Sequence, residues 1–288
     1  MVIGVDGGGT GCRARLADAQ GRVLGAATGG PATVRLGIDR SMAAVEQACR
    51  AALAEARLPA ESLGAIDAGI GLAGLGRKGA LEQLQARPHP FRSVRYVDDA
   101  TIACIGAHGG RDGGIVVVGT GSVGVAVVGG REIRVGGYGF PISDEGSGAD
   151  LGLRAVRFAL RANDGREPAT GFTRAVMARF GNDPYEAVAW MDRATATDYA
   201  ILAPLVMGHA SDGDAAAANI VRKGARRIEQ LVRWLIERSA PRVALVGGLA
   251  ASMAPWLAPE TQRLLSPVEG DAVDGALALA RRAAAGSG

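Results

Sequence analysis

The hydrophobic positions of this chain form short apolar runs, and most runs end at glycine or aspartate. Residues 2–5 are followed by Asp6-Gly-Gly-Gly-Thr10, which predicts a strand that ends in a glycine loop. Residues 12–17 and 23–27 read as two more strands, joined by a turn over 18–22. The chain therefore opens with a strand, a glycine loop, a strand, a tight turn and a third strand.

The following segment alternates between helices and strands. Apolar residues at helical spacing predict a helix over 39–57, with Asp39 as its N-cap. The further elements expected here are a strand over 65–72, a helix over 78–86, a strand over 94–97 and a helix over 100–107. Asp98 and Asp99 thus stand where a strand leads into a helix.

The opening pattern then recurs. Residues 115–118 predict a strand, Gly119-Thr-Gly-Ser122 a second glycine loop, and residues 123–128 and 132–135 two strands around a Gly129-Gly130 turn. We interpret this recurrence as an internal structural duplication. The rest of the chain is expected to be mainly helical over 146–163 and 170–240, with a late strand over 242–246 and a last helix over 271–282.

Composition narrows the class of protein. The 288 residues are 48% hydrophobic and 21% charged, as expected of a globular chain with a core. The net charge is only +3 and the arginines are scattered, so nucleic-acid binding has little support. Three well-separated cysteines and three histidines without metal-ligand spacing indicate reduced thiols and no zinc site.

Two features bear on location. Residues 113–130 form the longest uncharged apolar stretch, but glycines interrupt it, so it reads as two strands and not as a membrane span. The chain begins with Met1 and an apolar strand rather than a signal peptide. We therefore expect a cytoplasmic protein without a membrane partner.

The two glycine loops suggest a phosphate clamp. Glycine lets backbone N–H groups converge on an anion, while Thr10, Thr120 and Ser122 add hydroxyl donors. Asp6, at the end of the first strand, could hold a hydrated Mg²⁺ against the phosphates. One such loop alone would be read as a tight turn, but two matched copies at strand ends favour phosphate binding.

Residues 119–124 also match the dinucleotide fingerprint GxGxxG, and Asp144 lies 20 residues beyond Gly124. That motif needs a helix directly after the loop, because the helix N-terminus binds the pyrophosphate. Here a β-hairpin is expected instead, so we reject a dehydrogenase. The chain also has no GxxxxGK[ST] segment, which argues against a P-loop NTPase.

Three segments carry a family resemblance. Asp6-Gly-Gly-Gly-Thr10, Gly119-Thr-Gly-Ser122 and Val246-Gly-Gly-Leu249 resemble the phosphate-1, phosphate-2 and adenosine motifs of the superfamily of sugar kinases, heat-shock protein 70 and actin. More narrowly, the chain resembles the N-acetylglucosamine kinase and glucosamine kinase branch, which shares a sequence family with the ATPase activators of 2-hydroxyacyl-CoA dehydratases and benzoyl-CoA reductases. The segments that add to this narrower resemblance are Gly30-Pro-Ala32, Asp99-Ala100, Gly136-Gly-Tyr-Gly139 and Asp144-Glu-Gly-Ser147.

The resemblance spans nearly the whole chain and implies a fold. It is an α/β fold of duplicated ribonuclease H-like, actin-like ATPase domains with a nucleotide cleft between them. We expect an N-terminal domain over 1–112 on the sugar and phosphate side and a C-terminal domain over 113–288 on the nucleotide side. The final helix is expected to pack back on the N-terminal domain.

The resemblance also assigns roles to residues. Asp99 matches the general base that acts on the sugar 6-hydroxyl, with Asp98 as its rival or as a simple helix cap. Asp144 matches the carboxylate that binds sugar hydroxyls, and Glu145 is either a ligand or a cap of the helix that starts near Gly146. The other residues implied to line the sugar site are Thr33, Gly137, Tyr138 and Gly139. Those implied to bind ATP are Asp6, Gly8, Gly9, Thr10, Gly119, Thr120, Gly121, Ser122, Gly247, Gly248 and Ser252, with Asp6 also as the Mg²⁺ ligand.

The implied activity is transfer of the γ-phosphate of ATP, with Mg²⁺, to N-acetylglucosamine or glucosamine, by a protein that in this family often forms homodimers. Two alternatives stay open. An activator ATPase of the dehydratase or reductase type would need cysteines to hold an iron–sulfur cluster. A non-catalytic sugar or nucleotide sensor would need no general base such as Asp99.

Overall fold

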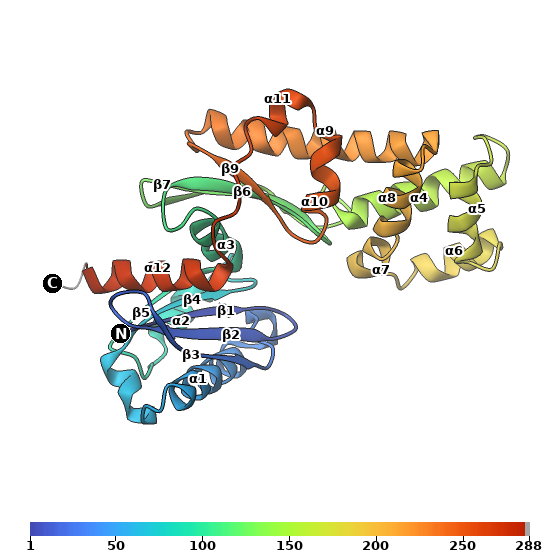
Figure 1. The fold of residues 1–288 in the computed structure, drawn as a ribbon. Coiled ribbons are helices and arrows are strands. Elements are labelled where there is room, and N and C mark those ends of the chain that lie inside the picture. The colour runs from blue at the N-terminus through green and yellow to red at the C-terminus, as the bar shows by residue number, and fades with distance from the viewer. Residues whose placement is uncertain (286–288) are drawn as a thin grey trace. The chain divides into compact units, whose positions relative to one another are not determined.

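The computed structural model describes residues 1–285, with side chains through residue 282, and contains two β-sheets (Figure 1). The first sheet has the strand order β3-β2-β1-β4-β5. Its strands are β1 (Val2–Gly7), β2 (Cys12–Ala17), β3 (Val23–Gly29), β4 (Asp67–Leu72) and β5 (Ser93–Asp98). β1, β2 and β3 form an antiparallel meander, whereas β4 and β5 run parallel to β1.

The second sheet repeats this order with one strand fewer. It runs β8-β7-β6-β9, with β6 (Gly113–Val118), β7 (Ser122–Val128), β8 (Arg131–Gly136) and β9 (Val243–Val246). β9 lies parallel to β6, as β4 lies parallel to β1. The duplication predicted from the two strand-loop-strand patterns is therefore confirmed.

The chain divides into two compact units. Unit 1 comprises residues 1–113, 126–132 and the chain from Pro267 onward, and unit 2 comprises residues 114–125 and 133–266. The helices of unit 1 are α1 (Ile38–Glu55), α2 (Ala80–Ala86), α3 (Asp99–Ala107) and α12 (Ala272–Ala285). α12 therefore belongs to the unit that holds the N-terminal sheet, although it comes last in the chain.

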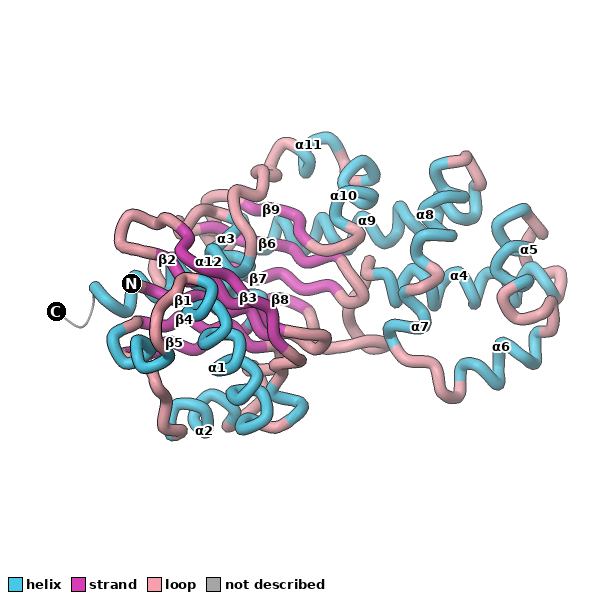
Figure 2. The backbone as a smooth tube through the Cα atoms, turned by 60° about the horizontal axis from the view of Figure 1, so that its bottom comes forward, coloured by secondary structure: helices cyan, strands magenta, loops and turns pink. Residues whose placement is uncertain are grey.

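Unit 2 is dominated by helices (Figure 2). They are α4 (Gly148–Asn163), α5 (Gly171–Ala178), α6 (Pro184–Met191), α7 (Ala196–Ala200), α8 (Ala203–Ser211), α9 (Ala215–Glu237), α10 (Ala250–Met253) and α11 (Pro259–Gln262). Side chains cap several of them at the N-terminus, such as Thr170 on α5 and Asp183 on α6. Figure 2 shows α4 to α8 gathered beyond the strands of this unit, while α9 runs back along them.

Two local expectations about helix starts are wrong. α1 begins at Ile38 after Gly37, whose φ of 91° favours glycine, and no side chain caps it. Asp39 instead lies inside the first turn, where its carboxylate pairs with Arg87 at 3.3 Å. α2 begins at Ala80 rather than Lys78, because Gly79 adopts the left-handed conformation just before it.

The two faces of the first sheet are covered in different ways. α1 and α2 cover one face through a core of aliphatic side chains such as Leu16, Ile70 and Leu53. α12 contacts β1 and β4 on the other face at positions where the sheet has glycine. A Cβ at Gly4 would lie 2.6 Å from the backbone nitrogen of Leu277, and one at Gly69 would overlap the carbonyl oxygen of Ala276. This helix therefore packs backbone to backbone.

We predict that Gly69→Ala destabilises unit 1, because the added methyl group lies 2.8 Å from the Ala280 nitrogen and overlaps the Ala276 carbonyl. Overpacking of this kind costs roughly 1–3 kcal/mol or more of the free energy of unfolding. Gly64→Ala is the matched control, since a Cβ there meets nothing within 4 Å. Thermal or urea unfolding of both variants tests this. Equal stability of the two would show that α12 is not seated closely on β4.

Candidate active site

The register of the first sheet places several candidate residues at one end. Gly7 pairs with Leu72, and Leu72 pairs with Asp98, across three parallel strands. Asp6 and Asp98 therefore lie at the same carboxyl-terminal edge, two strand spacings or roughly 10 Å apart. Open α/β sheets bind ligands outside this edge. Unit 1 thus gathers Asp6, Asp98 and Asp99 where a ligand would be expected.

The loop after β1 is closed by its own backbone. The Gly8 N–H donates to the Gly11 carbonyl at 2.9 Å, and the Gly8 carbonyl accepts from the Ala32 N–H at 2.9 Å. Gly9 and Thr10 at its tip are exposed, and a Cβ on Gly9 would meet nothing within 4 Å. The tip is therefore open to an anion, as a phosphate loop requires.

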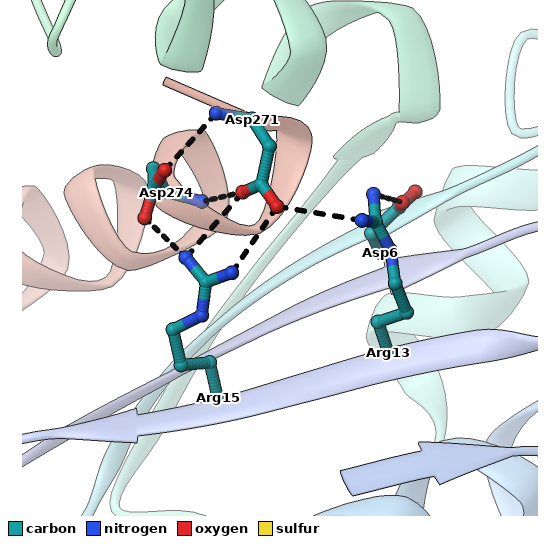
Figure 3. Close-up of polar contacts among 5 residues, drawn as sticks. All are labelled: Asp6, Arg13, Arg15, Asp271 and Asp274. Carbon is teal, nitrogen blue, oxygen red and sulfur yellow. Dashed lines mark hydrogen bonds and ion pairs between the residues drawn. The ribbon is translucent and has the colours of Figure 1, made fainter. Parts of the chain in front are cut away.

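Asp6 belongs to a chain of charged groups (Figure 3). Its carboxylate accepts from Arg13 at 2.7 Å, and Arg13 also reaches Asp271 at 3.3 Å. Arg15 pairs with Asp271 at 3.1 Å and with Asp274. Asp271 and Asp274 accept each other's backbone N–H at the start of α12. The network thus links the end of β1 to the first turn of α12.

Mg²⁺ needs only one or two carboxylates when phosphates and water supply the other ligands. Among the described residues no group of three or more His, Cys, Asp or Glu could hold a metal ion. Asp6 could supply one hard oxygen ligand at the strand end, where its side chain is 21% exposed and paired with Arg13. A single carboxylate beside a phosphate loop fits Mg²⁺ held mainly by a nucleotide.

The carboxylates of Asp98 and Asp99 both accept from the Ala100 N–H at the start of α3, that of Asp99 at 3.0 Å. Asp98 is the N-cap of α3, where its carboxylate accepts from the Ala100 N–H at 3.2 Å. The capping interpretation of Asp98 is therefore confirmed. Asp99 is half-buried, and burial together with the neighbouring Asp98 charge raises its pKa to about 7. The Asp6 carboxylate adds to this rise.

Thr33 lies next to this edge but is already engaged. Its hydroxyl donates to the Ala73 carbonyl at 2.9 Å, and its own carbonyl accepts from Ser41 at 2.6 Å. The Thr33 side chain is also buried. Only its hydroxyl lone pairs would be left for a sugar.

The second glycine loop is held within unit 2. Gly119 N–H donates to the Gly121 carbonyl at 2.9 Å, and the first N–H groups of α4, from Gly148 and Ala149, donate to Gly119 and Thr120 at 2.8 and 3.2 Å. Thr120 is exposed, whereas Ser122 is buried and donates to the Glu145 carbonyl at 2.9 Å. β7 follows the loop directly, so the rejection of a dinucleotide fingerprint is confirmed.

The turn after β9 lies against this loop. The Leu249 N–H donates to the Val118 carbonyl at 2.9 Å, and Gly247 has a φ of 101° and lies close to Val118. Gly248 and Ser252 are exposed. A Cβ on Gly148 would meet Ala200, Gly119 and Leu249 within 3.1 to 3.2 Å. Ala200, at the end of α7, is thus a neighbour of the loop that the sequence patterns did not reveal.

Asp144 also lies beside this loop. It has a φ of 65°, its carboxylate accepts from the Gly139 N–H at 3.3 Å, and a Cβ on Gly121 would come within 2.5 Å of it. Burial raises its pKa. Gly137 and Gly139 have positive φ, and Tyr138 between them is 81% exposed. The loop therefore exposes a tyrosine side chain, and the residue after it donates to a half-buried carboxylate.

The expectation that Glu145 could cap the next helix is wrong. Ser147 caps α4 by accepting from the Asp150 N–H at 3.2 Å, and Asp150 accepts from the Gly146 N–H at 2.8 Å. A serine two residues further on is closer to the first free N–H groups of the helix. The Glu145 side chain is exposed and free of a capping role.

The three cysteines lie in separate elements of unit 1. Cys12 is in β2, Cys49 in α1 and Cys104 in α3, and all three are buried. Burial raises the pKa of the Cys12 and Cys49 thiols.

Among the described residues, no helix is both long and apolar enough to cross a bilayer.

The two sheets share one strand order, and each has a glycine loop after its first strand and carboxylates nearby. These features define a duplicated ribonuclease H-like, actin-like ATPase. The model of the BadF/BadG/BcrA/BcrD ATPase family matches residues 3–267, and the chain belongs to this family. A glucosamine kinase, GspK, from Vibrio cholerae is 38% identical over 278 residues, covering 96% of this chain and 95% of the relative. An N-acetylmuramic acid/N-acetylglucosamine kinase from Clostridium acetobutylicum is 28% identical, covering 82% of this chain and 79% of the relative.

Solved structures show the same fold. A candidate N-acetylglucosamine kinase from Chromobacterium violaceum is 38% identical, with a TM-score of 0.85 over 97% of this chain and 98% of that one. A ROK family glucokinase from Streptomyces griseus, crystallised with glucose and AMPPNP, has a TM-score of 0.53 at 21% identity, over 98% and 99% of the two chains. The second likeness supports the fold alone.

We predict that Asp99 makes the stability of the protein depend on pH. Its pKa of about 7 in the folded chain lies above the ordinary value of 3.8, so the unfolded chain loses this proton first as pH rises. Asp99 should therefore make the free energy of unfolding fall as pH rises from about 4 to 7. The Asp99→Asn variant lacks this contribution, so its free energy of unfolding should fall less over the same range. Urea unfolding of both proteins at about pH 4.5 and 7.5 measures it. Parallel pH profiles for the two proteins would contradict the raised pKa.

Proposed function

We propose that this protein is an ATP-dependent amino-sugar kinase that transfers the γ-phosphate of ATP to the 6-hydroxyl of glucosamine or N-acetylglucosamine. The hydroxyl oxygen forms the new bond to phosphorus, the bond to the bridging oxygen of ADP breaks, and Asp99 accepts the hydroxyl proton. The products are the sugar 6-phosphate and ADP.

One observation carries this proposal, and it is the state of Asp99. A general base works best when its pKa is near the operating pH. The half-buried Asp99 carboxyl, with its pKa raised to about 7, meets that requirement at the ligand-binding edge of the first sheet. Both carboxylates accept from the Ala100 N–H, Asp98 at 3.2 Å and Asp99 at 3.0 Å, and Asp99 is the candidate because burial raises its pKa. The names of the relatives agree with this reaction class.

The nucleotide would be bound through the glycine loops of both units. The loops over Gly8, Gly9 and Thr10 and over Gly119, Thr120 and Gly121 would receive phosphate oxygens, with Gly9, Thr10 and Thr120 exposed. Gly247, Gly248 and Ser252 would lie beside the adenosine. Ser122 would hold the loop in its conformation, since its hydroxyl donates a hydrogen bond to the Glu145 carbonyl. Bound Mg²⁺ supplies charge neutralisation of the phosphates. Asp6 would hold it, and Arg13 fixes the Asp6 carboxylate in place.

The sugar would be oriented by polar groups from both halves of the chain. Asp144 would accept hydrogen bonds from sugar hydroxyls, and Tyr138, between Gly137 and Gly139, would offer its exposed ring as a face for the sugar. Glu145 is exposed and free to contact a ligand. Thr33 would contribute only as an acceptor, because its hydroxyl proton is donated to Ala73.

We predict that Asp99→Asn lowers turnover by about 10²–10⁴-fold, the usual effect of losing a general base, while ATP binding is retained. Asp98→Asn is the matched control, since asparagine also caps helices and the change keeps Asp99. Removing the Asp98 charge should lower the pKa of Asp99 and shift the acidic limb of the rate profile to lower pH. A coupled ADP-release assay over pH measures both. Comparable losses in the two variants would assign the base elsewhere.

A second prediction concerns the acceptor. Purified protein with ATP and Mg²⁺ should release ADP faster with glucosamine or N-acetylglucosamine than with glucose, because a kinase of this class must recognise the substituent at the sugar 2-position. Comparing kcat/KM for these three sugars measures the preference. No ADP release above background with either amino sugar would refute the proposed function.

A further inference from the structure

A second concave site lies in unit 2, between α4 and α9. It has a volume of about 230 Å³, and four of the side chains around it are cationic: Arg154, Arg157, Arg161 and Lys223. Glu167 contributes a carboxylate and Asn219 an amide to the same groove. The groove is large enough for a phosphorylated small molecule. None of the residues assigned above to the nucleotide or the sugar lines it.

Helical spacing explains how the cations converge. Arg154, Arg157 and Arg161 are three, then four residues apart on α4, so they share one face of that helix. Asn219 and Lys223 are four residues apart on α9 and share a face there. The two helices approach closely at Gly224, where a Cβ would lie 3.1 Å from Leu151. The two faces therefore open into one groove beside this contact.

The charges of this groove are only partly neutralised. Arg154 pairs with Asp150 at 2.8 Å, and Arg161 lies at the longer distance of 3.7 Å from Glu167. Among the described residues, the side chains of Arg157 and Lys223 make no hydrogen bond or ion pair. Like charges at these helical spacings repel one another. The groove thus holds about two positive charges in excess, which a bound anion would offset.

The groove and the candidate active site use different faces of α4. Gly148 and Gly152 face α7, where a Cβ would meet Ala200 and the backbone of Tyr199. The cationic face is turned to α9 and lies further along the helix. An anion in the groove would therefore leave the Gly119 loop free.

We propose that this groove binds the phosphate group of a small phosphorylated molecule. Arginine guanidinium groups suit phosphate because their N–H donors bond two oxygens at once, and lysine adds a point charge. Arg161 also lies 5.5 Å from the ring centre of Phe158, so an apolar surface continues from the cations. That surface would contact the organic part of the ligand. The proposal does not depend on the reaction proposed above.

Isothermal titration with pyrophosphate and, separately, glucose 6-phosphate tests the site at constant ionic strength, because salt screens exposed charges. The double variant Arg157→Gln/Lys223→Gln removes the two unpaired cations. Arg179→Gln/Arg193→Gln is the control, since these exposed residues do not line the groove and the net charge changes equally. The wild type and the control should bind at least one of the anions, with affinity at least tenfold above that of the double variant. The anion that binds tighter distinguishes a diphosphate from a phosphomonoester ligand.

Hydrogen–deuterium exchange locates the binding. The expected result is protection of residues 154–161 and 219–223 by the anion in the wild type and not in the Arg157→Gln/Lys223→Gln variant. Absence of saturable binding by the wild type, or equal binding by the wild type and this variant, would overturn the proposal. Kinase activity is measured separately by ADP release, so loss of one result does not entail loss of the other.

Discussion

Unit 1 depends on the close seating of α12 against the first sheet. Glycines at positions 4 and 69 let the helix backbone touch β1 and β4, and Gly275 of the helix itself lies against the backbone of α3. Side chains at these positions would hold the helix away. A segment from the end of the chain thereby closes a sheet that the first hundred residues build, and it sets the position of α3, which begins at Asp99.

Ion pairs also connect α12 to the first sheet. Arg13 and Arg15 project from β2 to the first turn of α12, and Arg13 also holds Asp6 (Figure 3). The ion pairs are partly exposed, so each adds little to stability. These ion pairs instead fix the position of the Asp6 carboxylate, because they link the end of β1 to α12. The same unit leaves the Asp99 carboxyl half-buried beside a second carboxylate, which is the arrangement that raises its pKa.

Local signals in the sequence were sufficient for most of the fold. The apolar runs and glycine turns predicted the strands around both loops. Asp98 was also recognised as a possible cap of α3 from its place before the helix. Helix starts were less predictable where a glycine conformation competed with an acidic residue, as at Gly37 and Asp39. The seating of α12, the Arg13 contact of Asp6 and the approach of Ala200 to the Gly119 loop join distant segments. No periodicity within one element reports such contacts, so only the structure reveals them.

The proposed function requires both glycine loops to bind a single nucleotide. Hydrogen–deuterium exchange with and without a non-hydrolysable ATP analogue and Mg²⁺ tests this most directly. The account predicts that backbone amides of residues 8–11 and of residues 119–122 become protected together, at the same analogue concentration. Protection of one loop alone, with the other unchanged at saturation, would contradict it.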